Sequence, residues 1–141
     1  MQQPIVISGA GILGCYISCA LSLQGIDSIV LEKKDDEVED SVRTITLNPF
    51  SKNLLDKIGI ENDYSMINKM EVKDFDGTGK IVFKSSEIGM DHLAYVSDFA
   101  TLLMAVRKKA SEKILYKEEI IDIDNKGDLN EVTLSSGKVI K

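Results

Sequence analysis

The fold of this chain is decided by PIVISGAGILG, residues 4–14, which joins a short apolar run to a turn with three glycines. Residues 4–8 predict a buried β-strand, and the residues after the turn predict a helix that ends near residues 24–25. A second apolar run, SIVLE at residues 28–32, predicts another strand. Strand, glycine turn, helix and strand in this order are typical of a parallel βαβ unit, so we expect an α/β fold.

Each glycine of the turn has a steric reason to be there. Gly9 permits the sharp turn out of the strand, Gly11 leaves room for a phosphate to approach the backbone, and Gly14 lets the helix lie close to the sheet. The backbone N–H groups of the first helical turn, which includes Ile12 and Leu13, then face an anion. The pattern predicts a site for the diphosphate of a dinucleotide, and the alternative is a purely structural glycine turn.

An acidic residue supports the dinucleotide interpretation. Glu32 closes the second predicted strand, 23 residues after Gly9. In dinucleotide-binding units an acid about 20 residues beyond the glycines accepts hydrogen bonds from the adenosine ribose. A carboxylate there favours a free 2′-hydroxyl and repels a 2′-phosphate.

The same N-terminal residues have some features of a secretion signal. Residues 1–26 carry no charge, and ILGC at residues 12–15 loosely matches the cleavage box of a lipoprotein signal. A signal peptide needs a basic leading region, which is absent, and polar residues interrupt the apolar run. No segment has the roughly 18 uninterrupted apolar residues of a membrane span. We therefore expect a soluble, cytoplasmic protein.

Composition excludes several function classes. The 141 residues are 43% hydrophobic, which suffices for one domain with a core, and the net charge of −6 without a basic stripe argues against binding of nucleic acid.

Cys15 and Cys19 share one face of the first predicted helix, but the sequence offers no further ligands for a metal there. His92 is the only histidine and lies in a stretch without pattern, so we name no metal site and no catalytic residue.

The rest of the chain does not continue as a plain repeat of strand and helix. After a solvated acidic loop at residues 35–40, an alternating run leads to a helix at 49–58 that Asn48 caps. Asp98 caps a later helix that continues to about residue 113, with basic residues 107–109 suited to its C-terminal half. The predicted strands are a hairpin at 69–75 and 80–84 with one apolar face, a short strand at 93–96, a third parallel strand at 114–116, and a meander at 120–124, 131–134 and 139–140. Because the last run stops in mid-pattern, we expect the front part of a longer protein.

Two blocks resemble a known family. The fingerprint at residues 9–14 with Glu32 and Lys33, and SVRTITLNP (41–49) followed by SKNLLDKIG (51–59), resemble the FAD-dependent aromatic hydroxylases. Within these single-component flavoprotein monooxygenases, the chain is most similar to the ubiquinone-biosynthesis hydroxylases. The resemblance covers essentially the whole chain.

This resemblance implies a Rossmann-like FAD-binding domain of the glutathione-reductase-like type, here incomplete. It implies that residues 1–141 are the N-terminal part of that domain and that residues 69–96 begin the sheet of a substrate domain. Arg43 would reach the cofactor as a rigid fork of donors beside a diphosphate; the alternative is a partner for the preceding acidic loop. The backbone around Ile120 would lie against the adenine. The residues expected to bind FAD are Gly9, Gly11, Ile12, Leu13, Gly14, Glu32, Lys33, Arg43 and Ile120.

The full-length relatives imply an aromatic small-molecule substrate, here a prenylated quinone precursor, and NAD(P)H as reductant. Association with the inner membrane would be peripheral and through parts absent from this sequence; the oligomeric state stays open. Two features depart from the family: the helix that begins near Asp98 offers the flavin only the hydroxyl of Thr101, and the later glycine-aspartate motifs are absent. We therefore expect the chain alone to be inactive or nearly so. The alternatives are an NAD-binding module of a dehydrogenase or nucleotide sensor, and a structural fragment that binds no cofactor.

Overall fold

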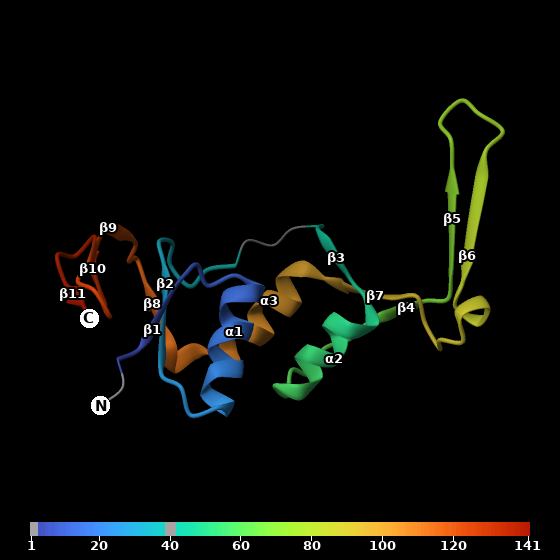
Figure 1. Cartoon of the computed structure of the whole chain (residues 1–141). Coiled ribbons are helices and arrows are strands. Elements are labelled where there is room, and N and C mark those ends of the chain that lie inside the picture. Colours follow the sequence, from blue (N-terminus) through green and yellow to red (C-terminus); the bar gives the residue numbers. More distant parts are fainter. Residues whose placement is uncertain (1–2, 39–41) are drawn as a thin grey trace. The chain divides into compact units, whose positions relative to one another are not determined.

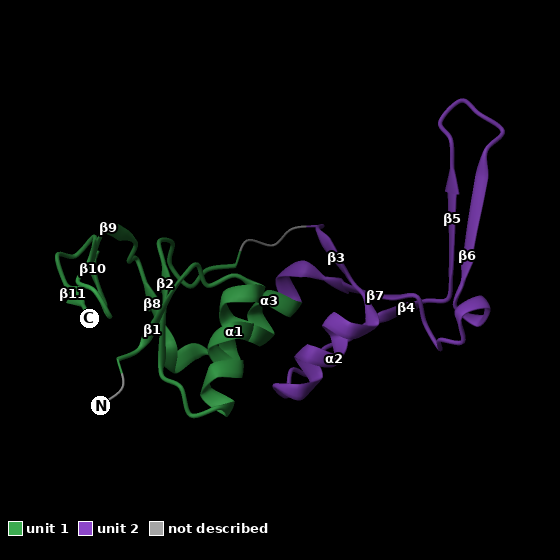
Figure 2. Cartoon of the chain, viewed as in Figure 1, with its two compact units in different colours: residues 1–40, 102–141 green, residues 41–101 purple. Residues whose placement is uncertain are grey.

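The computed structural model describes residues 3–38 and 42–141, which form two compact units. The first unit combines residues 1–40 with 102–141, and the second contains residues 41–101 (Figure 2). Two segments that are distant in sequence therefore build the first unit together. The acidic loop and the run that begins at Ser41 fall partly on residues 39–41, outside the described residues.

The first unit contains a parallel sheet with the strand order β1-β2-β8 (Figure 1). Strand β1 (Ile5–Ser8) leads through the glycine turn to helix α1 (Ile12–Leu23), and β2 (Ser28–Glu32) follows at the centre of the sheet. Strand β8 (Ile114–Tyr116) pairs with β2 in the register Glu32↔Tyr116. These elements confirm the predicted parallel βαβ unit and its third strand.

The two faces of this sheet have different covers, because successive residues of a strand point to opposite faces. Ser28 of β2 shares a buried hydrogen bond of 2.8 Å with Ser18 of α1, so the face of Ser28, Val30 and Glu32 is the α1 face. Leu31 faces the other way and packs with Val132, Leu134 and Ile140. Those three residues belong to an antiparallel meander of β9 (Ile120–Asn125), β10 (Asn130–Leu134) and β11 (Val139–Ile140), which the alternating pattern predicted.

The second unit contains an antiparallel sheet with the order β3-β7-β4. Strand β3 (Thr44–Leu47) precedes helix α2 (Pro49–Lys57), whose first turn is capped by Asn48: its side chain accepts a 2.7 Å hydrogen bond from the Ser51 N–H. Strand β4 (Ser65–Ile67) was not predicted, and β7 (Ala94–Asp98) lies one residue later than expected at its start and two at its end.

A two-stranded hairpin of β5 (Lys69–Lys73) and β6 (Lys80–Lys84) completes the second unit and is followed by a 3₁₀ turn at Ser85–Ile88. Its register places Met70 opposite Phe83 and Val72 opposite Ile81, which puts these four apolar side chains on one face, as predicted. All four are exposed.

Helix α3 (Phe99–Lys109) begins in the second unit and continues into the first. Asp98 caps it, since its Oδ1 accepts a 2.7 Å hydrogen bond from the Thr101 N–H. The helix ends earlier than the predicted residue 113, because residues Ser111–Lys113 form a separate 3₁₀ turn. In the described part of the chain, no helix combines the length and the apolar character needed to cross a membrane.

Candidate functional site

The glycine turn between β1 and α1 requires glycine at two of its three glycine positions, for different reasons. Gly9 has φ +101°, a backbone conformation that side chains with a Cβ rarely adopt. A Cβ on Gly14 would lie 2.1 Å from the Gly9 carbonyl oxygen and 3.4 Å from Cγ2 of Ile7. Both glycines are therefore required by the turn itself, before any ligand is considered.

Gly11 differs, because neither its backbone angle nor its surroundings require a glycine. A Cβ built there would meet no atom within 4 Å, and Gly11 has φ −77°, which any residue tolerates. Gly11 is the N-cap of α1, and no side chain caps this end of the helix. The first N–H groups of α1, among them those of Ile12 and Leu13, are thus left for water or an anion.

The carboxylate of Glu32 lies against this turn. Its Oε2 accepts a 3.0 Å hydrogen bond from the Ala10 N–H, and its Oε1 accepts one of 3.1 Å from the Lys34 N–H. The side chain is 13% exposed. The end of β2 therefore places an acceptor beside the glycines, as the spacing of 23 residues predicted.

An arginine that sequence reasoning did not single out completes this arrangement. Arg107 of α3 donates from Nε to the Ala10 carbonyl at 2.8 Å, and its Nη2 lies 3.5 Å from Oε2 of Glu32. Its side chain is 12% exposed, and its Cζ lies 5.7 Å from the centre of the Tyr116 ring. Arg107, Lys108 and Lys109 all lie in the last turn of α3, as predicted. Arg107 in addition points inward to the glycine turn, whereas Lys108 and Lys109 are exposed.

A signal for this role was present in the sequence. Leu103, Val106 and Ala110 form part of the buried stripe of α3, and Arg107 follows Leu103 by four residues on the same face. A basic residue within a buried stripe needs a partner of opposite charge.

Two further predicted site residues also lie in the first unit. Lys33 follows β2 directly and is exposed. Ile120 begins β9 and packs, half-buried, against the cluster of Leu31 and the meander. Within the described residues the Lys33 ammonium makes no hydrogen bond or ion pair.

Arg43 belongs to the second unit, where an aromatic ring holds it. Its Cζ lies 4.5 Å from the centre of the Phe99 ring, and its carbonyl accepts a 2.9 Å hydrogen bond from the Phe99 N–H. Thr101 in the same unit donates its hydroxyl to Oδ1 of Asp98 at 2.8 Å. The alternative that Arg43 pairs with the acidic loop falls partly on residues 39 and 40, outside the described residues.

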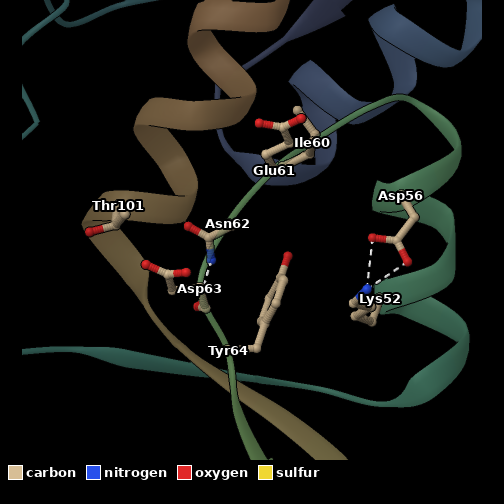
Figure 3. Close-up of a pocket in the computed structure, with 8 residues that line it drawn as sticks. All are labelled: Lys52, Asp56, Ile60, Glu61, Asn62, Asp63, Tyr64 and Thr101. Carbon is tan, nitrogen blue, oxygen red and sulfur yellow. Dashed lines mark hydrogen bonds and ion pairs between the residues drawn. The ribbon is translucent and has the colours of Figure 1, made fainter.

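The second unit also holds a pocket of about 570 Å³ (Figure 3). Three carboxylates line it, those of Asp56, Glu61 and Asp63, against a single ammonium group. That ammonium, Nζ of Lys52, already donates to Oδ2 of Asp56 at 2.7 Å. The excess of negative charge disfavours a phosphate-bearing ligand here.

Cys15 and Cys19 are free, buried thiols. Burial raises the pKa of the Cys15 thiol to about 11 and that of Cys19 above its usual range, so both stay protonated at neutral pH. No group of three or more potential ligands in the described ranges 3–38 and 42–141 is arranged to hold a metal ion.

Comparison with known proteins agrees with this geometry. The sequence model of a family described as FAD binding domain matches residues 2–128. The match includes the glycine turn, Glu32, Arg43 and Arg107.

Solved structures share the fold at low sequence identity. PqsL of Pseudomonas aeruginosa, described as a probable FAD-dependent monooxygenase, was solved with 2-aminobenzoylacetate; that structure has a TM-score of 0.80 and 20% identity over 97% of this chain and 40% of its own. The Diels-Alderase PyrE3 of pyrroindomycin biosynthesis has a TM-score of 0.77 and 22% identity over 99% of this chain and 30% of its own. HpxO of Klebsiella pneumoniae, in complex with FAD and uric acid, has a TM-score of 0.74 and 18% identity over 97% of this chain and 36% of its own. The chain therefore spans 40% or less of each of these proteins.

Proposed function

The chain belongs to the FAD binding domain family and its cofactor is FAD; from this premise we propose that it is the FAD-binding portion of a flavin-dependent monooxygenase that hydroxylates an aromatic ring. The observation that carries the proposal is the meeting of the glycine turn, the uncapped start of α1 and the Glu32 carboxylate at one residue, Ala10. When bound, FAD supplies the redox chemistry, and the protein supplies binding and orientation.

The diphosphate of FAD binds, in this proposal, at the start of α1. The N–H groups of Gly11, Ile12, Leu13 and Gly14 are the donors, and the positive end of the helix dipole adds to their attraction for an anion. The open space at Gly11 fits the close approach of a phosphate to the backbone.

The adenosine half lies toward the end of β2. Glu32 accepts a hydrogen bond from a ribose hydroxyl at Oε1, which retains a free lone pair beside the bond from Lys34, whereas Oε2 already accepts from Ala10 and Arg107. Lys33 and the backbone at Ile120 complete this half, the latter against the adenine. A contact of Arg43 with the cofactor stays a prediction from the family resemblance.

For the substrate, the proposal names a chemical class. The complex of PqsL with 2-aminobenzoylacetate supports a small molecule with an aromatic ring. The resemblance to the ubiquinone-biosynthesis hydroxylases narrows this to a prenylated quinone precursor, with NAD(P)H as reductant and a cytoplasmic site peripheral to the inner membrane. The same proposal includes two structural features. The domain is of the glutathione-reductase-like type, and residues 69–96 are the first strands of a substrate domain.

Activity is a property of the longer proteins. Because these 141 residues span 40% or less of the structures they resemble, we expect them to bind FAD without turning over a substrate.

The test is binding of FAD and of NAD to the purified 141-residue protein, measured by calorimetry and by quenching of flavin fluorescence. We expect FAD to bind more tightly than NAD. Glu32→Gln should weaken FAD binding at least tenfold, since a hydrogen bond to a charged group contributes about 1.5–3 kcal/mol. Glu37→Gln, at an exposed position of the acidic loop, is the matched control and should bind as the wild type does.

Two outcomes would contradict the proposal. Tight binding of NAD without FAD would favour a dehydrogenase module or a nucleotide sensor. Binding of neither would favour a structural fragment.

A further inference from the structure

We propose that Arg107 is a positioning residue for the adenosine diphosphate part of FAD: it fixes the Glu32 carboxylate and the Ala10 peptide before the cofactor binds. The inference rests on the proposed function and deepens it. It adds a residue from a distant part of the sequence to the glycine turn and the acid.

The contacts form a closed triangle around Ala10. Glu32 accepts from the Ala10 N–H at 3.0 Å, Arg107 donates to the Ala10 carbonyl at 2.8 Å, and the two side chains meet at 3.5 Å. Ala10 itself is fully buried. The residue between Gly9 and Gly11 is therefore held through both of its backbone polar groups.

Holding the Ala10 carbonyl has a consequence for the next N–H group. A peptide bond is planar and trans, so the Gly11 N–H points away from the Ala10 carbonyl, and hence from Arg107. Within the part of the chain that the structure describes, the Gly11 N–H has no acceptor. Arg107 thus sets the direction of a free donor at the start of α1, where the diphosphate binds.

The pair of Arg107 and Glu32 also fixes the carboxylate. Both side chains are nearly nine-tenths buried, and an ion pair screened from water is stronger than one on the surface. Tyr116, the register partner of Glu32 on β8, lies beneath the guanidinium and limits its movement. A carboxylate that is already oriented loses less side-chain freedom when the ribose binds.

One donor of Arg107 is left over. Nη1 is buried and has no hydrogen-bond partner among the described residues. A buried unpaired donor is costly in a purely structural arginine, and such exceptions concentrate at functional sites.

The experiment measures FAD affinity by calorimetry in Arg107→Met, in Glu32→Gln and in the double variant. Met keeps most of the length of the side chain and removes its charge and donors. We expect Arg107→Met to weaken FAD binding at least tenfold, about 1.4 kcal/mol, in the wild-type background. In the Glu32→Gln background the same change should weaken it threefold at most, because the acid that Arg107 orients is already altered and only the contact with the Ala10 carbonyl remains to be lost.

Lys108→Met is the matched control, since it removes a basic residue from the same helix at an exposed position, and FAD affinity should stay unchanged. Arg107→Lys should restore part of the affinity, because one ammonium group keeps the charge and loses the fork of donors. A structural arginine would lower the unfolding temperature without this dependence on Glu32.

Equal weakening in both backgrounds, or no weakening at all, would overturn the inference while FAD binding by the wild type upholds the proposed function. Absence of FAD binding in the wild type would overturn both. If circular dichroism shows that Arg107→Met does not fold, Arg107→Gln replaces it under the same criteria.

Discussion

Gly14 is the residue of the glycine turn with the least room. A Cβ added there would lie 2.1 Å from the carbonyl oxygen of Gly9. That oxygen belongs to the backbone of the turn and cannot move away without breaking the turn. Gly11, three residues earlier, has open space at the same position. We therefore expect Gly14 to be needed for the stability of the fold, and Gly11 to be needed for binding of the cofactor.

We predict that Gly14→Ala lowers the free energy of unfolding by roughly 3 kcal/mol or more, as overpacking does in a rigid site. Gly11→Ala should change it by about 0.5 kcal/mol or less, as at most open positions, yet weaken FAD binding because the methyl group occupies the approach of the phosphate. Urea unfolding and calorimetry measure the two effects. Similar stability losses in both variants would show that the turn is packed differently.

Cys15 provides a test that depends on pH. Burial raises its pKa from 9.0 to about 11, so the unfolded chain releases this proton at lower pH than the folded one. The stability that the protonated thiol contributes is complete below pH 9 and is lost as the pH rises toward 11.

We therefore expect the unfolding free energy of the wild type to fall more steeply between pH 9 and 11 than that of Cys15→Ala. Urea unfolding across this range measures the difference. Parallel curves for the two proteins would mean that Cys15 is accessible to water.

The contact of Arg107 with Glu32 is a feature of single residues that could not be predicted from the sequence. Gly9, Gly14 and Glu32 were recognised because their spacing follows from one local unit. The contact of Arg107 with Glu32 joins residues 75 apart, and its pattern signal, a basic residue on a buried stripe, does not name the partner.

At the scale of elements, helix α2 owes its start to one side chain. The Asn48 amide oxygen satisfies the Ser51 N–H, and Pro49 follows at a position where its missing N–H costs nothing. We predict that Asn48→Ala lowers the free energy of unfolding by about 1 kcal/mol. Asn48→Asp keeps the acceptor and should stay within a few tenths of a kcal/mol of the wild type. An unchanged midpoint for the alanine variant in urea unfolding would argue against the cap.

The β5–β6 hairpin is an element without a cover. Every residue of β5 is exposed, and so are the four side chains of the apolar face, those of Met70, Val72, Ile81 and Phe83. A two-stranded hairpin is marginally stable by itself. We predict that its amides exchange with deuterium much faster than those of β2, which is nearly buried throughout. Protection equal to that of β2 would show that the hairpin is stable without further strands.

Elements that rest on local pattern were predictable from the sequence, and those that rest on distant pairing were not. The βαβ unit, the Asn48 and Asp98 caps and the hairpin each lie within one short segment. Strand β4 has three residues, too few for an alternating pattern, and it is a strand only because β7, about 30 residues later, pairs with it. Such pairing leaves no periodic signal in the shorter strand.

At the scale of the whole molecule, the chain leaves the first unit, forms the second unit with 61 residues, and then returns to complete the first unit. This return brings β8 beside β2, the meander over Leu31, and Arg107 to the glycine turn. The third parallel strand was expected from its apolar run, but the contact of Arg107, which precedes that strand, with the glycine turn was not. The return of the chain, more than any single motif, builds the site.

The most direct measurement of FAD binding at this site is a titration of the ¹⁵N-labelled protein with FAD, followed by NMR. We predict that the amide signals of Gly9, Gly11, Ile12 and Leu13 shift together with those next to Glu32. Glu32→Gln should reduce these shifts at the same concentration of FAD. Unchanged signals in the glycine turn, with shifts confined to other parts of the chain such as the pocket around Lys52, would contradict the site.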